Sequence, residues 1–248
     1  MRSVVALLLL SLAPFPALCQ RRTDAQIRDA LRGYDSTEAQ RAALLRGFGM
    51  EADEAKSYAF DDNDTNPIKV EWIALRPVAG ARARALFLPC RDFMFGARVL
   101  FLTEVDGAWK KQSEQGFDCH YDFDVSLQVI QITSATQFDL LVQHGCIGHG
   151  TGYVEQQAYL FRIVDGKLKL AWHDDDTLKN FGWSGAPSEL KKSTLLLTSP
   201  GVLEETRETF RLNEDGETIP GPLRVERRTF RWSTKDEKLI SSMFRRLR

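Results

Sequence analysis

Histidine and cysteine side chains offer the most reactive chemistry in this chain, which has four of each. They concentrate in two places, Cys119-His120 and a later segment that holds His144, Cys146 and His149. Imidazole and thiolate groups are ligands for zinc and other soft metals. The spacings match no standard zinc pattern, however, and the glycines of the later segment favour a turn with surface histidines. We therefore predict no metal site and no cofactor.

An enzyme would have to be built from the same histidines. The alternative function is a secreted hydrolase or metal-dependent enzyme that uses the set His120, His144, His149 and His173. The segment at residues 148–152 resembles the histidine segment of subtilisin-like proteases, but the serine-bearing segment of that family is absent from this sequence. A phosphate-binding loop, a GxSxG elbow and an HExxH helix are absent too. These observations favour a protein that is not an enzyme.

Two predicted loops carry histidine and aromatic residues that could bind a ligand. The loops are residues 144–153 and 180–184, because loops on a rigid β scaffold commonly carry recognition. Their candidate binding residues are His144, His149, Tyr153, Phe181 and Trp183. We interpret the chain as an exported, non-catalytic, β-rich binding or scaffold domain. The expected ligand is an envelope or extracellular protein or a glycan, and not a nucleic acid.

Three cysteines remain after the N-terminal segment, at positions 90, 119 and 146. Cys119 precedes one predicted strand and Cys146 follows the next. If those strands pair, both cysteines emerge at the same edge of the sheet, so we favour a Cys119–Cys146 disulfide. A Cys90–Cys119 bond is the second choice. Three buried, unpaired thiols are the remaining alternative.

Residues 1–19 have the layout of a secretory signal peptide. Arg2 gives a positive start, an apolar run follows, and small residues precede Gln20. The apolar run is too short to span a bilayer, and Leu18 before Cys19 does not fit a lipoprotein signal. We predict a Sec-type signal with cleavage near Cys19/Gln20, a secreted or periplasmic product, and no membrane span in the mature chain.

The charge of the mature chain is unevenly distributed. Residues 221–248 contain nine basic and three acidic residues, although the whole chain has a net charge of only −1. A basic end of this kind could touch an anionic envelope surface or dock the domain onto a larger assembly. The alternative is an ordinary solvated face.

Residues 20–57 are predicted to form two short helices. Asp35 and Glu38 are three residues apart, which predicts a capping box at the start of the second helix. Gly47 and Gly49 predict its end. Two short helices beside a sheet most often cover an edge or an open end.

The clearest strand signal is the dipeptide Asp165-Gly166 between two alternating apolar runs. Asp-Gly favours a two-residue type I′ turn, because both central residues need a positive φ. Such a turn sets the register of the two strands. The predicted facing pairs, all on one face, are Ile163 with Leu168, Phe161 with Leu170, and Tyr159 with Trp172.

An offset of 59 residues superposes this turn on Asp106-Gly107, which suggests an internal repeat. The predicted fold is mainly β, with about 10–12 strands in antiparallel four-strand meanders. It is a small or incomplete β-propeller-like array, and a twisted β-sandwich is the alternative. We expect one all-β domain at residues 58–248, with approximate repeats at 68–117, 125–176 and 190–244.

Overall fold

The structure is a computed structural model of the chain. It describes residues 22–33, 36–59, 71–89, 97–117, 121–133, 138–147, 153–174, 178–181, 189–213 and 217–247. Residues 121–126, 144–147, 153–156 and 178–181 are described by their backbone alone. The predicted signal peptide lies outside these ranges and stays a prediction. Within the described ranges, no helix has both the length and the apolar character needed to cross a membrane.

Three helices stand at the N-terminal side, where two were predicted. They are α1 (Asp24–Leu31), α2 (Glu38–Phe48) and α3 (Ala52–Ala59). The third was missed because its eight residues carry no N-cap signal, and burial of Ala55, Tyr58 and Ala59 stabilises it instead.

The second helix is capped by different residues from those predicted. Thr37 is its N-cap, and the Thr37 side chain accepts a hydrogen bond from the backbone N–H of Gln40 at 3.3 Å. The Gln40 side chain accepts one in return from the Thr37 N–H at 2.9 Å. The predicted box at Asp35 and Glu38 is therefore wrong, because the helix begins at Glu38. The end of α2 fits the prediction, since its C-cap Gly49 has φ 103°.

The described residues after α3 form three antiparallel sheets, each built as a four-strand meander. Sheet A contains β1 (Glu71–Val78), β2 (Ala81–Leu88), β3 (Ala97–Val105) and β4 (Ala108–Phe117). Sheet B contains β5 (Tyr121–Ile130), β6 (Asp139–Ile147), β7 (Tyr153–Val164) and β8 (Lys167–His173), with β9 (Leu178–Phe181) paired to β7. Sheet C contains β10 (Glu189–Ser199), β11 (Val202–Arg211), β12 (Arg224–Ser233) and β13 (Lys238–Ser241), with β14 (Arg245–Arg246) paired to β12. The prediction of a mainly β fold made of antiparallel meanders is confirmed.

The two Asp-Gly dipeptides adopt the predicted turns. Asp165 and Gly166 have φ values of 50° and 71°, and Asp106 and Gly107 have 50° and 76°. Both residues of each turn are therefore in the left-handed region that a type I′ turn requires. A third turn of this kind, Ala79-Gly80, joins β1 to β2 with φ values of 50° and 83°. Its first residue gives no sequence signal, because alanine rarely adopts a positive φ.

The register of the β7–β8 hairpin agrees with the prediction near the turn. Ile163 is paired with Leu168, and Phe161 with Leu170, as expected. Further along the hairpin, the expected pair of Tyr159 with Trp172 is wrong.

A register shift in β8 causes this difference. Tyr159 is paired with His173 and Leu160 with Trp172, because Ala171 is an extra residue between the two registers. One extra residue moves the following side chains to the opposite face of a strand. Trp172 therefore packs towards sheet C, where its ring meets Phe230 at a centroid distance of 5.0 Å.

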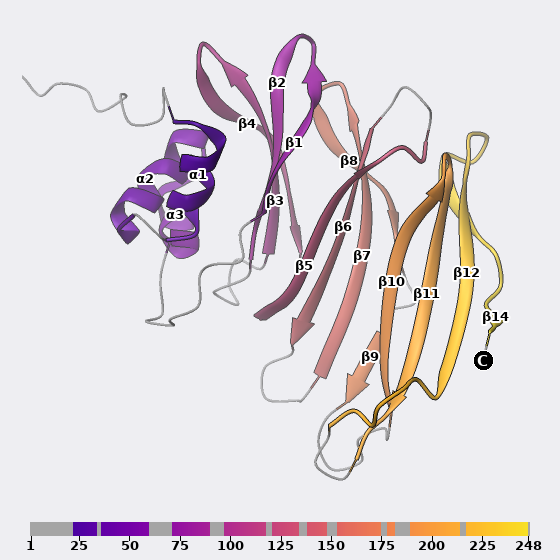
Figure 1. Ribbon diagram of the computed structural model, residues 1–248. Coiled ribbons are helices and arrows are strands. Elements are labelled where there is room, and N and C mark those ends of the chain that lie inside the picture. Colours follow the sequence, from indigo (N-terminus) through magenta and orange to yellow (C-terminus); the bar gives the residue numbers. More distant parts are fainter. Residues whose placement is uncertain are drawn as a thin grey trace, which may run out of the picture.

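The helices and the three sheets are stacked as successive layers (Figure 1). The helices cover one face of sheet A, and Phe48 stacks on Trp72 with ring centroids 5.8 Å apart. The other face of sheet A packs on sheet B through Phe117 and Phe161, with centroids 5.9 Å apart. Full burial of a side chain such as Phe161 contributes about 1.5–3 kcal/mol to stability.

Sheets A and B present corresponding faces to the layer that precedes each of them. Leu102 and Trp109 of sheet A face the helices, whereas Phe161 and Leu168 of sheet B face sheet A. Residues that correspond through the 59-residue offset, such as Leu102 and Phe161, therefore occupy matching faces of sheets A and B. The proposed repeat boundaries at 68–117, 125–176 and 190–244 stay an interpretation.

The stack is open at sheet C. The helices already occupy the face of sheet A that a closing sheet would need, and the described residues show no closed propeller. The outer face of sheet C carries exposed polar residues such as Thr194 and Arg227 on β10 and β12. A polar outer face is typical of the last layer in a stacked array.

Candidate functional site

Several predicted site residues lie outside the described ranges. These are Cys90, Cys119, His120, His149 and Trp183. The favoured Cys119–Cys146 disulfide, the Cys90–Cys119 alternative and the histidine set of the enzyme hypothesis therefore remain predictions. The strand pairing that the favoured disulfide requires is present, because β5 and β6 are antiparallel and Tyr121 is paired with Ile147.

His144 and Cys146 lie on β6, near the end of the strand, so the prediction that His144 is in a loop and that Cys146 follows the strand is wrong. The backbone pairs His144 with Gln157 of β7, and Cys146 with Glu155. Both residues sit at the end of sheet B that is opposite the Asp165-Gly166 turn.

Tyr153 and Phe181 are neighbours in sheet B. Phe181 was predicted to lie in a loop, but it ends the short strand β9, and the backbone pairs it with Tyr153 of β7. Tyr153 and Phe181, one residue from each predicted binding loop, are therefore adjacent at one end of the sheet, and both lie in strands. The sequence could not show this contact, because a four-residue strand leaves almost no periodic signal.

His173 is packed in a stack of aromatic rings between sheets A and B. Its imidazole lies on the Tyr159 ring, with centroids 4.4 Å apart and an interplanar angle of 14°. The Tyr159 ring in turn meets Phe117 at 4.6 Å. Asp174, the next residue, has its carboxylate on Arg228 of sheet C. The sequence placed His173 beside an acidic run, but these contacts take the imidazole and the Asp174 carboxylate to different neighbouring sheets.

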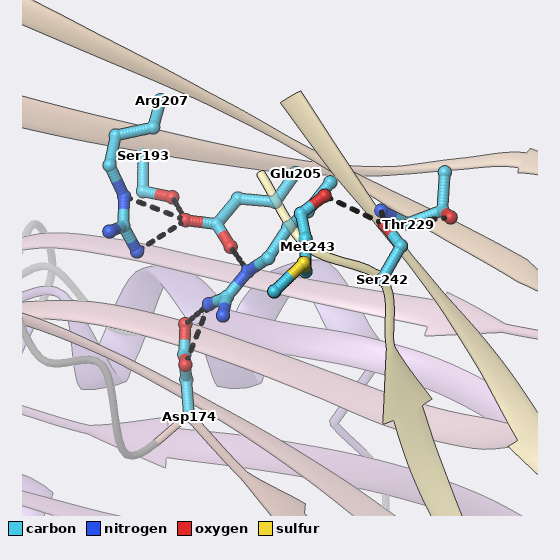
Figure 2. A network of polar contacts seen from close by, with 8 residues as sticks. Asp174, Ser193, Glu205, Arg207, Thr229, Ser242 and Met243 are labelled. Atoms are coloured by element: carbon cyan, nitrogen blue, oxygen red, sulfur yellow. Dashed lines mark hydrogen bonds and ion pairs between the residues drawn. The ribbon is translucent and has the colours of Figure 1, made fainter. Parts of the chain in front are cut away.

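A network of buried and partly buried charges links sheets B and C (Figure 2). At its centre is Glu205 of β11, which is 0% exposed. Glu205 Oε1 accepts hydrogen bonds from Arg207 Nη2 at 3.0 Å, from Arg207 Nε at 3.3 Å and from the Ser193 hydroxyl. Its other oxygen, Oε2, accepts one from Nε of Arg228 on β12. The Glu205 carboxylate is thus fully engaged, as burial of a charge requires.

Arg228 bridges the two sheets. Its Nη2 donates to both carboxylate oxygens of Asp174 at 2.9 and 3.0 Å, while its Nε bonds Glu205. Burial alone would lower the pKa of Arg228, but the charges of Glu205 and Asp174 outweigh it and raise that pKa above its ordinary value. Arg228 therefore remains a fixed cation between two carboxylates.

Phe244 covers the two guanidinium groups. Its ring lies 4.2 Å from the Arg207 guanidinium carbon and 4.6 Å from that of Arg228. The segment before it is held to β12, since the Ser242 side chain accepts a hydrogen bond from the Thr229 N–H at 2.9 Å. An aromatic face over a partly desolvated cation is an attractive arrangement and also limits water access.

We call the set of Asp174, Ser193, Glu205, Arg207 and Arg228 the inter-sheet clamp. It contains two cations and two anions, so its formal charges cancel. Each carboxylate is held by an arginine, which fits a structural link better than proton transfer. Within the described part of the chain, no group of three or more His, Cys, Asp and Glu residues is placed to hold a metal ion.

The clamp was missed at the sequence level, although β11 contains a signal for it. Leu203, Glu205 and Arg207 alternate along the strand, and Leu203 is buried against sheet B. Charged residues that continue an inward-facing row must find partners there. The partner Asp174 comes from another sheet, so only the tertiary structure identifies the pair.

These features define the class of protein as an open stack of antiparallel meanders, joined by aromatic layers and a buried ionic clamp. Comparison with known proteins does not assign the chain to a family, since no protein-family model and no curated protein matches it.

Proposed function

We propose that the protein is an exported, non-catalytic, β-rich scaffold that binds a protein or a glycan. Binding takes place at the end of sheet B opposite its two-residue turn, through His144, His149, Tyr153, Phe181 and Trp183. The scaffold corresponds to an incomplete propeller-like array whose sheets act as successive blades. Export rests on the signal-peptide pattern of residues 1–19.

The pairing of Tyr153 with Phe181 is the observation that carries this proposal. It brings together two segments that are separated by more than twenty residues in sequence and that were both proposed to bind. Aromatic residues contribute strongly to recognition surfaces because they bury a large area at a small cost in side-chain entropy. Backbone pairing also fixes the chain at these two positions before a ligand binds, which lowers the backbone entropy lost on binding.

The inter-sheet clamp supports the same proposal. Asp174 directly follows β8, so its two bonds to Arg228 anchor the chain just before the segment that leads into β9. A binding surface on fixed strands pays less conformational entropy when the ligand binds. The alternative is a hydrolase or metal-dependent enzyme, of whose four histidines His120 and His149 lie outside the described residues.

Ligand binding can be tested by substitution at the paired residues. The purified mature protein would be screened against a glycan array and against extracellular proteins, and each hit measured by calorimetry. We expect Tyr153→Ala with Phe181→Ala to weaken binding at least tenfold. The matched control is Leu170→Ala, which removes an exposed apolar side chain close to the Asp165-Gly166 turn and should leave affinity unchanged.

Two outcomes would count against this function. Binding that survives the double substitution would move the site elsewhere on the molecule. Hydrolysis of a substrate, lost on substitution of His144 or His149, would establish the enzyme alternative.

A further inference from the structure

The last edge of sheet C combines exposed arginine and lysine residues with exposed aliphatic side chains. Residues 221–248 hold nine basic and three acidic residues. Arg228 is buried and paired in the inter-sheet clamp, but most of the other basic residues are exposed. Arg231 and Arg245 have no acidic partner in the part of the chain that the structure describes, so their charge is available to a partner.

Two short strands form this edge, one after the other, beside β12. β13 pairs with the second half of β12, where Ile240 lies opposite Arg231. β14 pairs with the first half, where Arg245 lies opposite Arg227. The linking residues 242–244 include Phe244, whose ring is held on Arg207 and Arg228. That anchor fixes the segment, whereas the neighbouring Met243 side chain is exposed to solvent.

The aliphatic residues on this edge are unusually exposed. Met243 is 93% exposed, Ile240 49% and Leu247 48%. Single exposed apolar residues need no explanation, but here three of them lie among basic residues along one edge. We call this set the basic edge, and its members are Arg231, Lys238, Ile240, Met243, Arg245 and Leu247.

We propose that the basic edge docks the protein onto the surface of an anionic lipid bilayer. Arginine and lysine would pair with the phosphate groups of the lipids, and Met243 and Leu247 would enter the boundary between headgroups and acyl chains. This surface is separate from the end of sheet B that carries Tyr153 and Phe181. Its test can therefore fail without affecting the proposed ligand binding, and the reverse also holds.

The side-chain types favour a bilayer over other anionic partners. A nucleic-acid surface typically adds aromatic side chains on which bases stack, whereas the exposed apolar residues of this edge are aliphatic. A protein partner gains most from fully buried anchors in pockets. A protruding, flexible methionine suits a fluid surface, because such a surface can close around it.

Vesicle binding tests the charged part of the proposal. Mature protein would be sedimented with vesicles of phosphatidylcholine, with and without phosphatidylglycerol, at low salt and at about 0.15 M salt, where the Debye length is about 8 Å. We expect binding only when phosphatidylglycerol is present, and weaker binding at the higher salt. Arg231→Gln with Arg245→Gln should weaken binding about 25-fold, or about fivefold for each lost charge near the membrane.

The matched control removes two exposed cations from the helical layer on the far side of the stack. Arg46→Gln with Lys56→Gln changes the net charge equally, and both residues are exposed. This variant should bind vesicles as the wild type does. Circular dichroism of both double variants would show that the fold is retained.

A second pair of variants tests the aliphatic part. Leu247→Ser should weaken binding to phosphatidylglycerol vesicles about tenfold. Val105→Ser removes a side chain of similar exposure, 46%, from sheet A and should have no effect. The proposal would be overturned if the protein did not bind anionic vesicles, or if the helical-layer control lost as much binding as the Arg231 and Arg245 variant. It would also be overturned if inorganic phosphate abolished binding while sodium chloride at the same ionic strength did not. Recovery of an acidic protein through this edge, without vesicle binding, would assign the edge to that partner instead.

Discussion

Arg228 of sheet C donates from Nη2 to both carboxylate oxygens of Asp174, at 2.9 and 3.0 Å, and Asp174 directly follows strand β8 of sheet B. The same guanidinium bonds Glu205 of its own sheet. One side chain therefore joins two layers whose remaining contacts in this interface are largely apolar.

Removal of the central cation should destabilise the fold strongly. Arg228→Met leaves the buried carboxylate of Glu205 and the partly buried carboxylate of Asp174 without their shared partner. Breaking a buried ion pair in this way costs about 3–5 kcal/mol. Urea unfolding would measure the loss. Arg231→Gln, an exposed arginine on the same strand, should change stability by less than about 0.5 kcal/mol. A cost equal to that of the exposed control would show that Arg228 is not a clamp.

Two aspartates should give opposite pH dependences of stability. Burial would raise the pKa of Asp24, but hydrogen bonding and charge from Arg84 outweigh it and lower that pKa. Its contribution is present above the unfolded-state pKa of about 3.9 and is lost as pH falls through the lower folded-state value. The stability advantage of wild type over Asp24→Asn should therefore shrink as pH falls.

Asp139 should behave in the opposite way. Burial raises the pKa of Asp139 even though Thr133 and Ile132 donate hydrogen bonds to its carboxylate. The contribution of Asp139 to folding stability is present below its unfolded-state pKa of about 3.9. It is lost as pH rises through the higher folded-state pKa. Wild type should lose stability relative to Asp139→Asn as pH rises. Urea midpoints measured from about pH 3 to pH 7 would compare the two series, and parallel slopes would contradict this assignment.

The register shift at Ala171 predicts which aromatic pair is coupled. A double-mutant cycle between Trp172 and Phe230, with leucine as the replacement, should give a coupling energy of about 0.5–1.5 kcal/mol. The same cycle between Trp172 and Tyr159 should give a value near zero, because the two rings lie on different faces. Strong coupling to Tyr159 would restore the regular register expected from the sequence.

Substitution by alanine should change stability differently at two glycines. Gly166 has φ 71°, so Gly166→Ala should cost about 1–2 kcal/mol even though a Cβ would meet no atom within 4 Å. Gly116 also has open space around its Cβ position, but its φ is not in the left-handed range. Gly116→Ala should therefore be neutral or stabilise by about 0.5–1 kcal/mol. Thermal unfolding of the two variants separates backbone strain from steric contact.

Peptide mapping of the exported protein would test the N-terminal and cysteine predictions together. The mature chain should begin near Gln20, and a non-reduced digest should contain Cys119 linked to Cys146. A linked Cys90–Cys119 peptide would support the alternative bond. An intact Arg2 on the exported protein would contradict the signal-peptide interpretation.

Local signals explain most of what could be predicted. Asp165-Gly166 needs only its own backbone geometry to form a turn, and that turn fixes Ile163 opposite Leu168. The Ala79-Gly80 turn and the short strand β9 were missed because neither carries a residue pattern that distinguishes it from a loop. The capping box failed for a related reason, since Thr37-Gln40 and Asp35-Glu38 satisfy the same pattern and only one can begin the helix.

The sequence by itself therefore determined the mainly β character, the antiparallel hairpins and the alternation of buried side chains, because these depend on neighbours a few residues apart. Only the tertiary structure decided the order of the layers, the shift that turns Trp172 towards Phe230, and the meeting of Arg228 with Asp174. Those contacts join residues more than fifty positions apart. Their energy arises from burial between sheets, which no local pattern records.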